Sequence, residues 1–125
     1  MASTLTVFSS AARGSGANAS GVFGCDGKGA IFVLDVTAVS GTSPTLDLKI
    51  QVFSPLGNDY VDLAGAAFAQ KTAANTSMLT VYPGIAETAN VSVSDVMPPL
   101  FRAVGTVGGS ATPTVTFSLA CYVID

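Results

Sequence analysis

The chain has 125 residues, of which 49% are hydrophobic and only 10% are charged, and its formal net charge is -3. A chain of this length fits one domain with one hydrophobic core. Five Lys and Arg residues cannot form the basic surface that nucleic acid requires, and the lack of His removes the commonest general base and metal ligand. The composition therefore argues against nucleic-acid binding and against an enzyme, and it predicts no cofactor.

The small number of charges also predicts association. Five basic and eight acidic side chains cannot cover the surface of a domain of this size. The remaining exterior must consist of Ser, Thr, Gly, Ala and some larger apolar groups. Little desolvation of charge opposes the burial of such a surface against a partner. We therefore expect self-association or a large permanent partner rather than a lone monomer.

The first 29 residues are expected to form an N-terminal arm, followed by a single domain over residues 30–125. A short strand is predicted over residues 5–9. Residues 10–29 are rich in Gly, Ala and Ser, a composition that disfavours a regular helix. We interpret them as an arm or long loop that wraps over the body or over a neighbouring molecule, because Val22 and Phe23 would be unfavourable in water.

Two strands are predicted next, joined by a four-residue turn. Residues 30–40 (AIFVLDVTAVS) are rich in β-branched and aromatic side chains, which predicts a central, well-buried strand. Residues 45–54 (TLDLKIQVFS) alternate between apolar and polar side chains, which predicts a strand with one face in the core. Because Gly-Thr-Ser-Pro at residues 41–44 is a turn signal, we expect these strands to form an antiparallel hairpin.

The middle of the chain predicts several short strands. Residues 60–63 follow a Pro-Leu-Gly-Asn turn, and residues 64–69 are expected to be strand or coil. Residues 71–77 are predicted to form a polar loop. A strand over residues 78–82 ends at Pro-Gly, and a short one over residues 91–94 precedes Pro-Pro.

The C-terminal segment carries the clearest pattern. A strand over residues 100–107 is followed by a Gly-rich loop at residues 108–113. Residues 114–123 then alternate strictly, so that Val115, Phe117 and Leu119 share one face with Cys121 and Val123. The apolar face must be buried, and the opposite face is expected to meet water or another subunit. The chain as a whole predicts an all-β fold of roughly seven to nine short strands, an antiparallel β-sandwich of jelly-roll-like or immunoglobulin-like type, or a barrel.

Catalytic and metal-binding motifs are weak. Without His, a Ser nucleophile would need Lys or a carboxylate as its base, and neither G-x-S-x-G nor S-x-x-K occurs. Asp59 and Asp62 lie close to Asn58, and Asp26 lies in a Gly-rich segment. Turn capping explains these side chains better than a calcium site does. We expect neither a catalytic site nor a metal site.

Two cysteines, Cys25 and Cys121, are expected to be reduced and packed, although a disulfide stays open as an alternative. No signal peptide and no apolar run of membrane-spanning length is recognised, so we expect assembly in a cytoplasm and no membrane partner.

Tyr60, Tyr82 and Tyr122 are candidates for a sugar-binding surface. Packing in the core or at an edge explains these rings better than sugar binding does, since Trp is absent.

Three stretches carry a resemblance to a known class of protein. They are GTSPTLDLKIQVFSPLGNDYVDLAG at residues 41–65, LTVYPG at residues 79–84, and PPLFRAVGTVGGSATPTVTFSLACYV at residues 98–123. Together they resemble small virion structural proteins of tailed bacteriophages, including capsid decoration (cement) proteins. Tyr60 stands where a Trp often follows the S-P-x-G turn in such proteins, and the N-terminal arm has no counterpart.

The resemblance implies a non-enzymatic β-sandwich that binds the major capsid protein on the outside of the phage head, commonly as a homotrimer, after assembly in the host bacterial cytoplasm. Two alternatives stay open: a glycan- or receptor-binding module of a spike or fibre, and another virion component such as a tail or connector subunit. The arm and the Gly-rich loop are the expected contact segments. The residues expected to meet a partner are Ser10, Arg13, Val22, Phe23, Gly108, Gly109 and Ser110.

Overall fold

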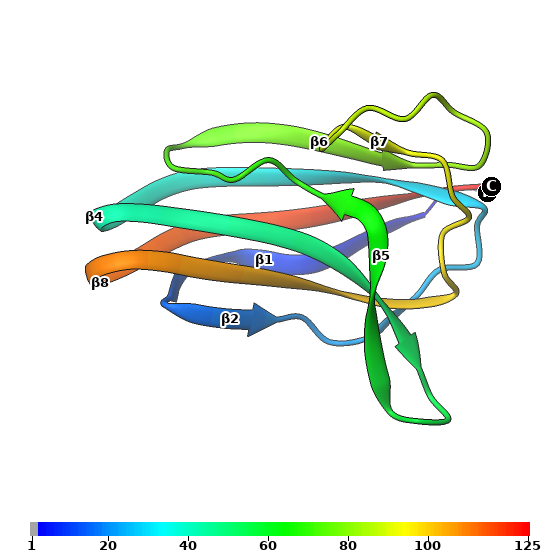
Figure 1. Cartoon of the computed structure of the whole chain (residues 1–125), viewed down its shortest axis with the longest axis horizontal. Coiled ribbons are helices and arrows are strands. Elements are labelled where there is room, and N and C mark those ends of the chain that lie inside the picture. The colour runs from blue at the N-terminus through cyan, green and yellow to red at the C-terminus, as the bar shows by residue number, and fades with distance from the viewer. Residues whose placement is uncertain (1–2) are drawn as a thin grey trace.

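The computed structural model describes residues 3–125, which form an all-β fold with no helix (Figure 1). All eight strands join one hydrogen-bonded sheet in the order β1-β8-β4-β6-β7, with β2 and β3 paired to β8 and β5 paired to β4. The predicted all-β class is therefore confirmed. The strands are β1 (Thr4–Gly14), β2 (Gly16–Ala19), β3 (Phe23–Gly24), β4 (Gly29–Ser54), β5 (Asp59–Ala67), β6 (Asn75–Val81), β7 (Ser92–Val93) and β8 (Leu100–Ile124).

Two long strands, β4 and β8, organise the fold. They pair antiparallel along almost their whole length, from Gly29 opposite Ile124 to Val52 opposite Phe101. Register shifts interrupt the ladder between Ser40 and Thr45 of β4. At this place both strands run to the same end of the molecule and turn back (Figure 1). The paired ribbon is thereby folded over onto itself, which produces two layers.

Each layer contains one half of each long strand. The first layer consists of β1, residues 114–124 of β8, residues 29–40 of β4, and β6 with β7. The second layer consists of β2 and β3, residues 100–108 of β8, residues 45–54 of β4, and β5. This arrangement is the expected β-sandwich. One pairing, that of β6 with β7, is parallel, so the sheet is mixed rather than wholly antiparallel.

The expected hairpin between residues 30–40 and 45–54 is not formed. Both segments belong to β4 and both pair with β8, so they lie in different layers. Gly41 has a φ of 97° and Ser43 a φ of 49°, and these left-handed residues turn the chain across the thickness of the sandwich. The turn residues correctly indicate a reversal. They do not indicate whether the reversed segment pairs with its neighbour or crosses to the other layer.

The N-terminal segment is part of the sandwich. β1 extends to Gly14, well beyond the strand expected over residues 5–9, and β2 and β3 replace much of the expected loop. All three strands pair with β8. Val7 and Phe8 are buried in the core. The segment therefore wraps over the body of its own chain and supplies one edge of both layers.

A smaller difference concerns the segment expected as a polar loop over residues 71–77. β6 already begins at Asn75, where it pairs with Val36. Lys71 is buried, and its backbone exchanges two 2.9 Å hydrogen bonds with Leu46. This segment closes the gap between the two layers beside β4, so it is ordered by backbone pairing that its polar composition does not indicate.

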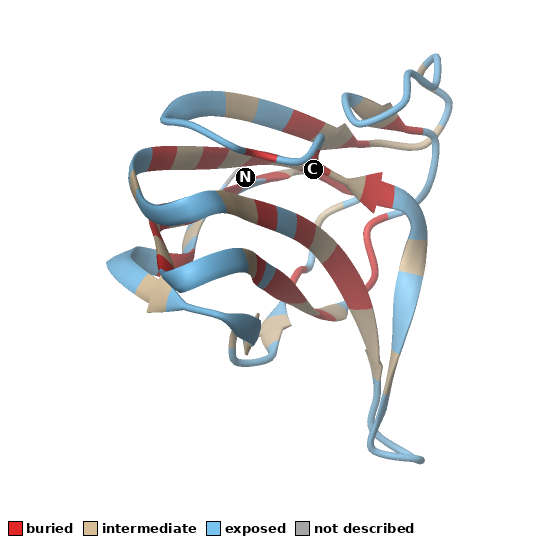
Figure 2. Ribbon diagram, turned by 60° about the vertical axis from the view of Figure 1, so that its left-hand side comes forward, coloured by how far each residue is buried: buried red, intermediate tan, exposed pale blue. Residues whose placement is uncertain are grey.

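The core fills the space between the layers, and buried residues alternate with outward-facing ones along the long strands (Figure 2). Phe32 of the first layer meets Phe101 of the second, edge to face, with ring centres 5.7 Å apart. Phe117 lies against Gly105, where a Cβ atom would come within 3.0 Å of the ring and 3.2 Å of Leu46. The closeness of the two layers therefore depends on the absence of a side chain at position 105.

This contact yields a stability prediction. Gly105→Val should lower the free energy of unfolding by about 1–3 kcal/mol, because the added methyl groups must displace the Phe117 ring in a closely packed core. Urea unfolding followed by circular dichroism measures the change. Thr106→Val, one position along and exposed, is the matched control and should have little effect. A Gly105→Val chain as stable as the wild type would contradict the packing described.

Candidate protein-binding surfaces

Three turns meet where β4 and β8 bend, and we call this surface the folded end. It consists of residues 14–16, 41–44 and 108–113, which contain no charged residue. The register brings the turns together, because Gly14 pairs with Thr114, Gly16 with Val107, and Thr42 with Ser110. The folded end is therefore a neutral surface of small residues, built from segments that are far apart in the sequence.

The turns of the folded end have a tightly specified backbone. Ser43, Ala111 and Thr112 have φ values of 49°, 58° and 54°, in a region that costs free energy for residues other than Gly. Gly109 has a φ of 120°, and a Cβ atom there would lie 2.9 Å from the carbonyl oxygens of Thr42 and Ser43. Close backbone approach thus requires Gly109 and holds the turns of β4 and β8 against each other.

The residues expected to meet a partner do not form one patch. Gly108, Gly109 and Ser110 belong to the folded end, whereas Phe23 pairs with Phe101 near the opposite end of the second layer. The Phe23 ring is partly buried, 6.0 Å from the ring of Phe101, and Val22 beside it is exposed. Ser10 is exposed on β1. The structure thus separates the expected contacts into at least two regions.

Arg13 is turned toward its own chain. Its guanidinium donates hydrogen bonds to the carbonyl oxygens of Phe117 at 2.8 Å, Ser9 at 2.7 Å and Ala11 at 3.2 Å. The same group lies 4.7 Å from the ring centre of Phe8 and 4.5 Å from that of Phe117. Partial burial lowers the pKa of the Arg13 guanidinium from its ordinary value. These contacts give Arg13 the role of a clamp between β1 and β8.

Removal of this clamp should weaken the fold. Arg13→Ala should lower the free energy of unfolding by about 1–2 kcal/mol, because it removes charge-assisted hydrogen bonds and two cation–π contacts at a partly exposed site. Chemical denaturation measures this loss, and Ser10→Ala on the same strand is the control that should leave stability unchanged. Unchanged stability of the Arg13→Ala chain, with weakened binding to a partner, would instead identify Arg13 as a contact residue.

The hairpin between β4 and β5 protrudes from the surface, which the sequence pattern does not predict. Residues 53–60 extend from the body between β4 and β5, and Leu56 at the tip is fully exposed (Figures 1 and 2). The rings of Phe53 and Tyr60 lie 5.1 Å apart, and the Arg102 guanidinium lies 3.4 Å from the centre of the Tyr60 ring. The one sequence signal for this tip is an apolar residue within the S-P-L-G-N turn.

A chain of polar contacts fixes the base of this hairpin. Arg102 Nε donates to Gln51 Oε1 at 2.8 Å, and Gln51 Nε2 donates to Asp62 Oδ1 at 2.9 Å. Lys49 Nζ donates to Asp62 Oδ2 at 3.1 Å. The hydrogen bond from Gln51, followed by that from Lys49, lowers the pKa of the Asp62 carboxyl below its ordinary value of 3.8. The hairpin is thus held to the outer face of the second layer.

The lowered pKa of Asp62 makes stability depend on pH. A carboxyl whose pKa is lower in the folded state stabilises the fold above its unfolded value, and this contribution is lost as the pH falls from about 3.8 through the lower folded pKa. Asp62→Asn should therefore reduce the acid-induced fall in melting temperature, measured by thermal unfolding between neutral and strongly acidic pH. Identical pH profiles for the two chains would contradict this assignment.

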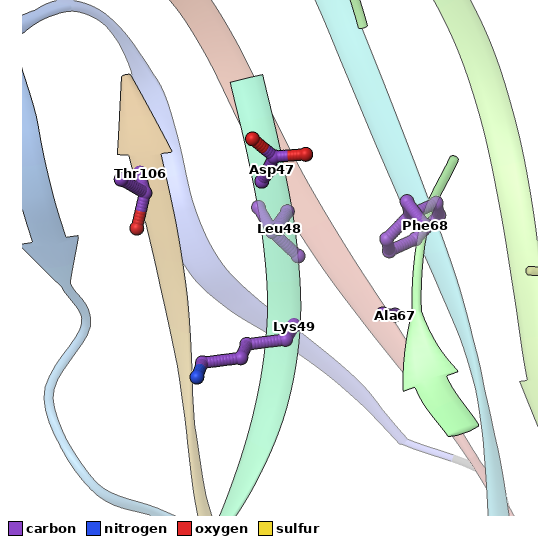
Figure 3. A pocket seen from close by; sticks show the side chains of 6 residues that line it. All are labelled: Asp47, Leu48, Lys49, Ala67, Phe68 and Thr106. Carbon is purple, nitrogen blue, oxygen red and sulfur yellow. The ribbon is translucent and has the colours of Figure 1, made fainter. Parts of the chain in front are cut away.

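A shallow depression of about 350 Å³ lies on the outer face of the second layer. Its lining includes Asp47, Lys49 and Phe68, and the amine of Lys49 points away from the Phe68 ring (Figure 3). Asp47 accepts hydrogen bonds from Gln70 at 3.2 and 3.0 Å, and Lys49 pairs with Asp62. The two charged groups of the depression already have partners within the chain, so they do not converge on a common ligand.

The candidate tyrosines are dispersed. Tyr60 is covered on one face by Arg102 on the second layer, whereas Tyr122 lies in the β8 segment of the first layer. Tyr82 follows the end of β6. The three rings therefore do not form a common stacking surface of the kind that a sugar would use.

The two cysteines are free and buried. Burial raises the pKa of the Cys121 thiol to about 12, with a smaller contribution from Cys25. The Cys121 thiol is therefore protonated at neutral pH, which makes it a poor nucleophile and a poor metal ligand. Its role in the structure is to pack in the core beside Phe32 and Leu5, its partners in the sheet register.

Within residues 3–125, no three His, Cys, Asp or Glu side chains gather in a group that could hold a metal ion. The same residues include no helix that is long and apolar enough to cross a bilayer.

In comparisons with known proteins, the sequence matches no family model, no curated protein and no solved structure.

Proposed function

We propose that this chain is a non-enzymatic structural protein of a bacteriophage virion, of the capsid decoration or cement type, which binds the major capsid protein on the outside of the head and stabilises the shell. The observation that best supports this proposal is the folded end. Its surface is neutral and its backbone is tightly specified by Gly109 and by the left-handed residues Ala111 and Thr112. Both properties favour binding to another protein.

The physical reasons are desolvation and entropy. A surface without ions loses little hydration free energy when it is covered. Turns that are already ordered lose little conformational entropy on binding, so more of the contact energy appears as affinity. When many copies bind one particle, each modest contact also adds to the stability of the whole shell. Gly108, Gly109 and Ser110 are the proposed contact residues, with Val22 and Phe23 at the opposite end as a second contact.

The alternative of a glycan-binding module has less support. It needs aromatic rings that converge on one exposed surface, and the ring of Tyr60 is already covered by Arg102. The alternative of a tail or connector subunit uses the same kind of protein contact. Copy number in purified particles separates the two: a cement protein is present in numbers comparable with the major capsid protein, and a connector subunit is present in far fewer copies.

The binding test uses shells assembled from the major capsid protein encoded in the same genome, incubated with the purified chain and sedimented. Ser110→Glu should weaken binding at least tenfold, about 1.4 kcal/mol, because it buries a charge at the folded end. Thr106→Glu is the matched control, since Thr106 is exposed on the outer face of the second layer, outside the folded end. Circular dichroism verifies that both variants are folded.

Each outcome is informative. Loss of binding by Ser110→Glu but not by Thr106→Glu supports the folded end as the contact. Equal binding by both variants would reject the folded end. A wild-type chain that does not bind shells, or that occurs in only a few copies per particle, would reject the decoration function itself.

A further inference from the structure

The outer face of the first layer is unusually poor in charge. We call it the first-layer face and define it by Ile31, Val33 and Asp35 of β4, Met78 of β6, and Ala120 and Tyr122 of β8. The register places Val33 between Met78 and Ala120, and Ile31 between Thr80 and Tyr122. Buried residues Phe32 and Leu34 alternate with them and point into the core. These six residues therefore share one solvent-facing side of the sheet.

The centre of this face is apolar and exposed. Met78 is 59% exposed and Tyr122 is 44% exposed, although both are large hydrophobic residues. Within residues 3–125, Asp35 is the one charged side chain that the strand register places on this face, and its carboxylate accepts a hydrogen bond from Thr76 at 2.9 Å. The remaining positions carry mainly Thr, Ser and Ala.

The outer face of the second layer, on the opposite side of the molecule, carries more charged side chains. The outer face of the second layer carries Asp47, Lys49 and Arg102 on the long strands and Asp62 on β5. Its charges are linked to one another or to polar neighbours. Four charged side chains therefore lie on the outer face of the second layer, against Asp35 alone among the residues that the strand register places on the first-layer face, which leaves the first-layer face better suited to burial.

We propose that the first-layer face binds the same face of a second copy of this chain, related by a two-fold axis. β1 and the first-layer segments of β8 and β4 are 11 or 12 residues long and β6 has seven residues, so the four strands cover roughly 650 Å² at normal strand spacing and rise. Two copies would bury roughly 1,300 Å² in total, which is within the range of stable protein interfaces. This inference does not rest on the proposed function.

The position of Asp35 fits a two-fold pair. Suppose that the two-fold axis lies in the interface, perpendicular to the strands, along the row formed by Val33, Ala120 and Met78. Met78 then lies opposite Met78 of the second copy. Asp35, two residues along β4 on one side of this row, lies opposite the row of Ile31 and Tyr122 on the other side, so the two carboxylates stay apart. The Tyr122 hydroxyl is then a donor within reach of the opposing carboxylate. Self-complementarity of this kind is what a two-fold interface requires.

Pairing through the edge of the layer is less favourable. β1 is the edge strand of the first layer, and its ladder with β8 is interrupted between Thr6 and Phe8 and again between Phe8 and Ala11. Such irregularities distort an edge and hinder the addition of another strand. The first-layer face is therefore favoured over the β1 edge as the surface between two copies.

Sedimentation velocity of the chain alone, over a range of concentrations, measures the association. The wild type should have the mass of a dimer. Met78→Lys should raise the dissociation constant at least tenfold, because it places two ammonium groups opposite each other without disturbing the core. Val61→Lys is the matched control, since Val61 is 60% exposed and lies on β5 outside the face. Thr6→Lys, in the same row as Met78, provides a second variant on the face.

A charge-exchange experiment tests the two-fold geometry directly. Met78→Glu alone should also dissociate, and a mixture of the Met78→Lys and Met78→Glu chains should recover the dimer, because position 78 faces itself. A wild-type monomer at about 0.1 mM would overturn the proposal. A trimer, as the resemblance to decoration proteins implies, would overturn the two-fold pair, and so would variants that dimerise unchanged or a mixture without recovery. Shell binding through the folded end is measured separately, so neither result decides the other.

Discussion

The pairing of β4 with β8 is the constraint on which the rest of this structure depends. Because both strands bend at the same register, one folded ribbon supplies the centre of both layers, and the apolar faces of all four halves meet in a single core. The bend is possible where Gly109 lets the backbone approach the carbonyl oxygens of Thr42 and Ser43. The neutral folded end is therefore a consequence of the same constraint that forms the sandwich.

Local periodicity was sufficient to predict much of this fold. Alternation over residues 114–123 and 45–50 correctly separates the buried side chains from the more exposed ones, because side-chain direction in a strand depends only on position. It fails at the end of the second segment, where Gln51 is buried among its hydrogen-bond partners and Val52 is only half-buried. Strand pairing depends instead on residues that are distant in the sequence. The turn at residues 41–44 looks like a hairpin turn, and only the presence of an equally bent β8 shows that the two segments enter different layers.

The candidate surfaces were harder to predict for the same reason. Composition predicts a loop over residues 108–113, and these residues instead form the bend of β8, with Pro113 buried. It also predicts an arm or long loop over residues 10–29, much of which pairs with β8. Arg13 is predicted to meet a partner, whereas the carbonyl oxygen of Phe117 that accepts its hydrogen bond belongs to the far end of its own chain. The first-layer face emerges only when Met78, Val33 and Ala120 are aligned by register, since they come from three separate strands.

The folded end and the first-layer face do not overlap, which gives the proposed assembly a simple geometry. A two-fold axis across the strands reverses the strand direction of the second copy, so the folded ends of a pair point in opposite directions. Each pair would then present two identical neutral ends to neighbouring subunits of a shell, while the charged outer faces of the second layers remain in water. The two proposed contacts, one between copies and one with the shell, would together account for the shortage of charge in the sequence.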